Sequence, residues 1–147
     1  LQLSTNNQQI ATHSLVHFDG PDGCLNQLQK AIASKNSHSI FNGVIKVPQV
    51  AQKTNASQLS RNLLLSNLAR IDTKPELEIV ADDVRCAHGA TVSQLNEEEL
   101  FYLCSRGIDA SQATSLLLSG YCQEIINTLP TEAIRWNILN RLLKGIS

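Results

Sequence analysis

Two side chains that commonly bind transition metals, Cys86 and His88, lie two positions apart in a segment of alternating residues. In a β-strand, residues two apart project from the same face. A thiolate and an imidazole on one face could ligate iron, zinc or copper, or act as a nucleophile and its base. The structural alternative is a buried cysteine beside a histidine that is hydrogen-bonded at the strand end. Spacing alone favours this alternative, because two ligands do not complete a tetrahedral site and the others would come from elsewhere or from another chain.

Other metal-binding residue types are scattered along the chain. Asp82 and Asp83 could bind a cation, but such a pair more often turns the chain through hydrogen bonds to the backbone. His13, His17 and His38 have no partners at ligand spacing. No phosphate-binding glycine loop, Gly-x-Ser-x-Gly turn or His-Glu-x-x-His pair is present. The sequence therefore predicts no nucleotide site within the chain.

The cysteines lie at positions 24, 86, 104 and 122, and none forms a Cys-x-x-Cys pair. A zinc knuckle or a thioredoxin-type motif is therefore unsupported. We expect reduced thiols in a cytosol-like compartment, most of them buried. Cys104 lies on the first predicted helix and Cys122 on the second, and both are expected to be packing residues.

Composition excludes several classes of protein. The chain has 147 residues, of which 42% are hydrophobic and 17% charged, which is typical of a folded domain. The net charge is −1 and no basic block occurs, so nucleic acid is not an expected partner. The longest apolar runs, such as Leu116 to Leu118, are too short to span a membrane. Methionine is absent even at position 1, which predicts a fragment or a processed chain.

The elements that must position Cys86 and His88 are short strands. Turn residues Gly20 to Gly23 separate two apolar stretches, and Ser39 to Val47 reads as a strand ended by Pro48. The cleanest alternation comprises Val84, Cys86, His88, Ala90 and Val92. Amide-rich, aromatic-poor composition suits a stacked β-solenoid, although no sequence repeat is apparent.

Helix signals replace strand signals after Val92. Asn96 is placed to cap a helix, with Glu99 as the return half of a capping box, and Gly107 is placed to end it. Asp109 is placed to cap a second helix, and Pro130 to open a third. The second helix has a predicted apolar stripe of Ala113, Leu116, Leu117, Gly120, Tyr121 and Ile125, and the third one of Ile134, Ile138, Leu139 and Leu142. These faces either close the domain or bind a partner, and residue types do not decide between the two.

Several unbroken motifs follow one another along the chain: Phe41–Val47, Gln52–Thr54, Asn62–Leu65, Ile71–Ile79, Ala81–Val92, Leu100–Leu103 and Ser105–Ile108. Together they resemble the SufB/SufD family of iron–sulfur cluster assembly scaffolds. Within the strongest segment, His88-Gly89-Ala90-Thr91 is similar to the SufD branch, since SufB proteins tend to carry Glu at the position of Gly89. Cys104 departs from this branch, where arginine is common.

The resemblance implies a fold and a function. Residues 1–92 would form the C-terminal part of a right-handed parallel β-helix, and residues 93–147 a small helical domain that docks an ATPase. The chain would be a non-catalytic scaffold, without a tightly bound cofactor, in the bacterial cytoplasm or the plastid stroma. It would pair with SufB through the end of the β-helix and bind the ATPase SufC through its helices, without nucleic acid or membrane. The expected partner-binding residues are Leu100, Phe101, Tyr102, Leu116, Leu117 and Tyr121.

The resemblance also assigns a role to the Cys-x-His strand. His88 would contact transient iron or a nascent cluster at the SufB interface, with Cys86 beside it, and ATP-driven closure of two SufC subunits would expose His88. Two alternatives remain open: a metal-binding module acting alone, and a β-helix enzyme acting on polysaccharides. The second would need convergent carboxylates along a cleft, which the sequence does not reveal.

Overall fold

The computed structural model describes residues 1–129, which form short strands followed by two helices. The predicted third helix, from Pro130, lies outside the described residues. The strands are β1 (Gln2–Ser4), β2 (Gln9–His17), β3 (Cys24–Ala33), β4 (His38–Val47), β5 (Asn55–Leu64), β6 (Arg70–Ile79) and β7 (Arg85–Gln94); the helices are α1 (Glu97–Ser105) and α2 (Ala110–Ile126).

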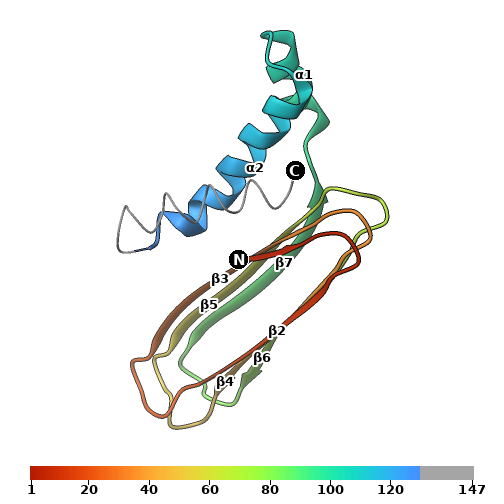
Figure 1. The fold of residues 1–147 in the computed structure, drawn as a ribbon. Helices are drawn as coiled ribbons and strands as arrows, with labels where there is room; N and C mark the ends of the chain where they lie inside the picture. Colours follow the sequence, from red (N-terminus) through yellow and green to blue (C-terminus); the bar gives the residue numbers. More distant parts are fainter. Residues whose placement is uncertain (130–147) are drawn as a thin grey trace.

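Alternate strands stack into two parallel sheets, in the orders β1-β3-β5-β7 and β2-β4-β6. Each strand pairs with the strand one coil later: Gln9 pairs with His38, and His38 pairs with Arg70. Figure 1 shows the resulting flattened coil, with α1 beyond the end of β7 and α2 folding back over the sheet. The predicted β-helix followed by helices is therefore confirmed, although its coils arise without a sequence repeat.

The corners of the coil contain residues in the left-handed backbone conformation, and backbone hydrogen bonds join successive corners. Asn6, Asp22, Lys35 and Lys53 all have φ between 55° and 60°. The Asp22 amide donates to the Gln52 carbonyl at 2.9 Å, and the Lys53 amide donates to the Asp83 carbonyl at 2.6 Å. The turn predicted at Gly20 to Gly23 lies at one such corner, between β2 and β3. Backbone bonds between coils therefore continue through the turns, which keeps the strands in register.

The interior of the coil is apolar at one end and polar in the middle. One cluster of buried side chains comprises Ile45, Val47, Ala51, Ala56 and Ala81. Gln58, Ser60 and Asn62 continue the inward row of β5 and are almost completely buried. Buried amides require hydrogen-bond partners, so this row needs a more specific geometry than an apolar core does.

Both described helices begin at the predicted caps. Asn96 Oδ1 accepts from the Glu98 amide at 2.9 Å, and Asp109 Oδ2 accepts from the Ser111 amide at 3.0 Å. Gly107 follows α1 with a φ of 88°, a conformation that glycine adopts without strain. The capping bond of Asn96 thus goes to the second helical residue rather than to Glu99.

The buried side of α2 matches the predicted stripe only in part, at Ala113. Leu118, Cys122 and Ile126 pack against Ile32 and Leu63 on the outer face of β3 and β5. Leu116 is exposed, and Leu117 and Tyr121 are only half-buried. Because α2 is apolar on several sides, its sequence pattern could not select one face.

The expectation that most cysteines are buried is wrong. Cys122 is buried, Cys86 is half-buried, and Cys24 and Cys104 are exposed. Cys104 lies on α1, which has no buried residue within the described part of the chain, and therefore is not a packing residue.

Candidate functional site

Cys86 and His88 lie on the inward face of β7, the last strand of its sheet. Their register partners on β5 are Ala56 and Gln58, both buried inside the coil. Cys86 is half-buried and packs against the apolar cluster that contains Ala56, whereas His88 is exposed. In parallel sheets, register partners project to the same side. The thiol and the imidazole therefore share one face, at an edge where the interior of the coil opens.

These two residues do not form a complete metal site on their own. Within residues 1–129, no group of three or more His, Cys, Asp and Glu side chains is arranged to hold a metal ion. A tetrahedral centre at this edge would need ligands from beyond the described residues. The arrangement supplies one soft and one borderline ligand that a second chain could complete.

A chain of hydrogen bonds between side chains runs through the coil toward His88. Gln27 Nε2 donates to Ser14 Oγ at 3.0 Å, and Gln58 Nε2 donates to Gln27 Oε1 at 2.8 Å. Gly43 makes room for this chain, because a Cβ at that position would collide with Gln58 Nε2. These residues were not predicted from the sequence. The feature that identifies them is a glutamine at the same register position in two successive coils, Gln27 and Gln58. Only the strand register shows that these positions correspond.

The other histidines have local partners on the outer face. His38 Nε2 lies 2.7 Å from Asp72 Oδ2, and Asn42 bonds to His13. Hydrogen bonds from Arg70 and then from His38 lower the pKa of Asp72. The pairing of His38 with Asp72 was also missed, because the two residues lie one coil apart.

The carboxylates of β6 alternate with cations and do not converge. Ion pairs join Lys46 to Glu78 and Lys74 to Glu76. Asp82 accepts a hydrogen bond from Gln49, and the Asp83 amide donates to the Gln52 side chain, so both residues lie at a turn, as predicted, but these bonds are not the predicted ones from aspartate side chains to the backbone. This arrangement offers no support for an enzyme acting on polysaccharides, which needs two carboxylates flanking a bond.

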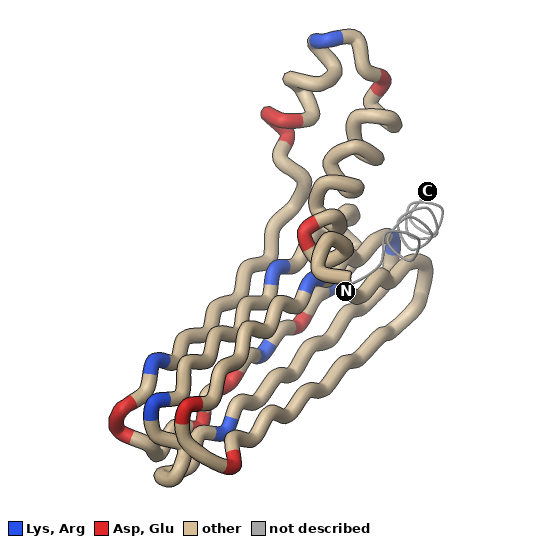
Figure 2. The backbone as a smooth tube through the Cα atoms, turned by 90° about the vertical axis from the view of Figure 1, so that its left-hand side faces the viewer, with Lys and Arg blue, Asp and Glu red and all other residues tan. Residues whose placement is uncertain are grey.

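The helices present a second candidate site, an apolar surface between α1 and α2. Phe101 is 74% exposed, Tyr102 is 56% exposed, and Leu116 is exposed as well. A groove of about 380 Å³ between the helices is bordered by Asn96, Glu98, Glu99, Tyr102, Leu103, Leu116 and Leu117. Figure 2 shows almost no charge along α2, where Glu124 is the one charged residue, whereas acidic residues gather at the start of α1. An exposed apolar surface of this kind commonly binds another protein.

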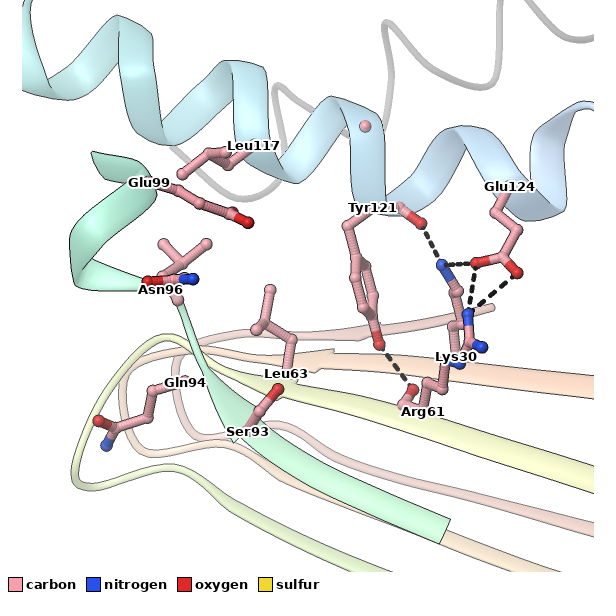
Figure 3. Close-up of a pocket in the computed structure, with 12 residues that line it drawn as sticks. Lys30, Arg61, Leu63, Ser93, Gln94, Asn96, Glu99, Leu117, Tyr121 and Glu124 are labelled. Atoms are coloured by element: carbon pink, nitrogen blue, oxygen red, sulfur yellow. Dashed lines mark hydrogen bonds and ion pairs between the residues drawn. The ribbon is translucent and has the colours of Figure 1, made fainter. Parts of the chain in front are cut away.

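A buried lysine joins α2 to the sheet beside a second cavity, of about 490 Å³. Figure 3 shows Lys30 Nζ between the Tyr121 carbonyl and the Glu124 carboxylate, at 2.6 Å from each. Arg61 also pairs with Glu124, and the Tyr121 hydroxyl donates to the Arg61 carbonyl at 2.6 Å. The hydrogen bond from Lys30 is the main cause of the lowered pKa of Glu124, while burial raises the pKa of Tyr121.

This junction was not predicted from the sequence. Lys30 is far from Tyr121 and Glu124 along the chain, and a lysine in a strand gives no local signal of burial. Of the six expected partner-binding residues, Tyr121 lies in the junction, while Leu100 and Leu117 are half-buried. Phe101, Tyr102 and Leu116 are exposed on the helices.

A parallel β-helix with a Cys-x-His strand at its edge, followed by helices with an exposed apolar surface, defines a β-helix protein with surfaces suited to association. Comparison of the sequence with known proteins identifies the family to which the chain belongs. Residues 1–121 match the family "SUF system FeS cluster assembly, SufBD core domain". The chain belongs to this SufB/SufD family, as the motifs around His88 predict.

Three relatives illustrate the likeness. SufD of Escherichia coli, an iron–sulfur cluster assembly protein, is 43% identical over 79% of the chain. A SufBD family iron–sulfur cluster assembly protein of Synechocystis is 46% identical over 92% of the chain. The chloroplastic protein ABCI7 of Arabidopsis thaliana is 41% identical over 98% of the chain. The chain spans 27 to 30% of the length of these relatives. No helix in residues 1–129 is long and apolar enough to cross a membrane.

Proposed function

We propose that the chain is a non-catalytic scaffold part of the SUF machinery for iron–sulfur cluster assembly, with SufB and the ATPase SufC as its partners. The observation that carries this proposal is the position of His88 on the inward face of β7, where the sheet ends within the described residues. The family match supports the pathway, because the SufBD core domain is described as part of the SUF system.

The open edge of the coil is the proposed surface for SufB. β7 bonds to β5 on one side. Among the described residues, no strand pairs with its other side. An unpaired edge presents backbone amides and carbonyls that a second chain could complete. Val92, Ile79 and Val80 are exposed large apolar side chains on β7, on β6 and just after β6, so a partner seated there would also bury apolar surface.

His88 is the proposed contact for iron at this interface, with Cys86 as a second, half-buried donor. Iron is here the cargo of the assembly reaction rather than a resident cofactor. A neutral imidazole and a thiolate are both suitable iron ligands, and a second chain would supply the remaining ones. Because Cys86 packs against the apolar cluster, we assign the principal role to His88.

The α1–α2 surface is the proposed docking site for the SufC-type ATPase. Its apolar part is provided by Leu100, Phe101, Tyr102, Leu116 and Leu117. Tyr121, the sixth expected residue, joins α2 to the sheet beside this surface. We assign docking to residues 93–147 and the coiled core to residues 1–92. ATP-driven closure of two SufC subunits would pull on the helices and, through the Lys30–Glu124 junction, shear the β7 edge so that His88 meets iron.

Relatives from a bacterium and from chloroplasts support the bacterial cytoplasm or the plastid stroma as the compartment. Neither a nucleic acid nor a membrane is a proposed partner, since the chain carries a net charge of −1 and no basic block.

Binding to a purified SufC-type ATPase tests the docking proposal. Size exclusion combined with calorimetry should give a one-to-one complex. A folded chain that fails to bind would remove the assignment of the helices to the ATPase.

Cluster assembly by the full SUF complex tests the role of His88. His88→Ala should slow assembly strongly without dissociating the complex, because it removes a ligand for iron from an exposed position on β7. His17→Ala, on the outer face of β2, is the matched control and should assemble clusters at the wild-type rate. Assembly by His88→Ala at the wild-type rate would refute the proposed iron contact.

A further inference from the structure

The chain of hydrogen bonds inside the coil ends on an acceptor without a donor. Gln58 is 1% exposed, and its Nε2 is committed to Gln27 Oε1 at 2.8 Å. Its Oε1 is buried and has no hydrogen-bond partner among the described residues. Buried amide oxygens are nearly always paired in folded proteins, so this atom marks a position where a donor is expected.

The strand register places one donor-bearing side chain of β7, His88, beside Gln58. Gln58 and His88 are register partners on adjacent strands, and their side chains project to the same side of the sheet. Adjacent strands lie about 4.8 Å apart, which is within reach of a glutamine and a histidine. A neutral imidazole carries one N–H donor and one nitrogen with a free electron pair.

Two neighbouring residues, Gly43 and Gln27, fix the orientation of the Gln58 amide. Gly43 provides the space that Nε2 occupies, and Gln27 accepts its hydrogen bond. Since Gln27 in turn donates to Ser14, the three side chains form one directional chain with Nε2 on the inner side. The oxygen of Gln58 is therefore the free end.

We propose that Gln58 is a positioning residue for His88: with a rotation of the exposed His88 side chain from its position in the structure, Gln58 Oε1 accepts a hydrogen bond from one ring N–H of His88 and leaves the other ring nitrogen free at the open edge. The identification of the ligand as iron rests on the proposed function. Histidines that bind metals generally donate their second ring N–H to a carbonyl or a carboxylate, which fixes both tautomer and orientation. Because an amide is neutral, this hydrogen bond fixes the tautomer without adding charge to the site.

Asn62 provides an internal comparison. It lies on the same strand as Gln58, and its Oδ1 is also buried and unpaired among the described residues. Its register partner on β7 is Val92, whose side chain has no donor. Replacement of Asn62 therefore perturbs the same interior without removing an acceptor opposite a histidine, which makes it the matched control.

Nitrogen-15 NMR of the ring nitrogens tests the hydrogen bond directly in the full chain, with His88 assigned by its absence in His88→Ala. At a pH where the ring is neutral, His88 should occupy a single tautomer with an N–H that exchanges slowly with water. In Gln58→Leu this signal should be lost and the tautomers should mix, whereas Asn62→Leu should keep the wild-type spectrum. An unchanged His88 spectrum in a folded Gln58→Leu chain would overturn the proposal.

Cluster assembly in the full complex separates this proposal from the one on which it rests. Gln58→Leu should slow assembly by about 10-fold or more, as removal of a partner of a ligating histidine generally does. Gln58→Glu, which keeps an acceptor oxygen, should recover part of the loss. If His88→Ala does not affect assembly but the tautomer depends on Gln58, the iron contact fails and the positioning role stands. If His88→Ala stops assembly but Gln58→Leu changes neither spectrum nor rate, only the positioning role fails.

Discussion

Lys30 of β3 and Glu124 of α2 form an ion pair of 2.6 Å that joins the coil to the helices. The lysine side chain is 3% exposed, whereas the glutamate is half-exposed. Lys30 also donates to the Tyr121 carbonyl and lies 4.1 Å from the centre of the Tyr121 ring. Because a buried ammonium group needs partners, displacement of α2 would leave the charge of Lys30 without a counter-ion on the sheet face.

Glu124→Gln should weaken this junction. The substitution keeps the shape of the side chain but removes the charge opposite Lys30 and Arg61. We expect a loss of about 1 to 3 kcal/mol in the free energy of unfolding, since the carboxylate is half-exposed but its partner is buried. Urea denaturation followed by circular dichroism measures the loss. Glu97→Gln, on α1, should change the unfolding free energy very little; equal effects of the two substitutions would contradict the junction.

Acid should weaken the same junction in the wild-type chain. The pKa of Glu124 lies below its ordinary value of 4.5, chiefly because of the hydrogen bond from Lys30. A carboxylate with a lowered pKa stabilises the folded state above pH 4.5, and this contribution is lost as the pH falls through the folded-state pKa. The difference in Tm between wild type and Glu124→Gln should thus be largest near neutral pH and shrink in acid. A difference that is constant with pH would be inconsistent with a charged Glu124.

Gly43→Ala should destabilise the coil. The added methyl group collides with the amide of Gln58 and with the ring of Phe41, both of which are buried. We expect a loss of about 1 to 3 kcal/mol in unfolding free energy, typical of an overfilled core. Gly120→Ala is the control: nothing lies within 4 Å of a Cβ there, and alanine favours a helix by about 1 kcal/mol over glycine. Equal effects at both positions would show that the Gln58 amide is not confined.

Phe101→Ser should separate partner binding from stability. Phe101 is 74% exposed, and α1 has no buried residue among those described, so the unfolding free energy should change by less than about 0.5 kcal/mol. Binding of the SufC-type ATPase should weaken by about 10-fold or more in calorimetry, as expected for a large apolar anchor. Leu68→Ser, equally exposed at 74% but in a corner of the coil, should leave the affinity unchanged. A similar loss of affinity in both variants would exclude a specific role for the helices.

Local features of the sequence predicted the element types. The alternation from Val84 to Val92 became β7, the turn residues after Phe18 became a corner, and Asn96, Gly107 and Asp109 took their expected places at helix ends. These features act over a few residues, through side-chain alternation, backbone conformation and capping, so sequence alone contains them. The family motifs were likewise contiguous and therefore readable.

Contacts between coils were decided by the tertiary structure alone. Gln58 meets Gln27, His38 meets Asp72, and Lys30 meets Glu124 because strand register and helix docking bring distant positions together. Helix periodicity could not choose which side of α2 faces the sheet, since that helix is apolar on several sides; the packing of Leu118 and Cys122 against Ile32 decided it. The sequence thus determined that a Cys-x-His strand precedes two capped helices. Only the stacking of coils placed His88 opposite the buried Gln58 amide at an open edge. That relationship depends on strand register, which no short stretch of sequence specifies.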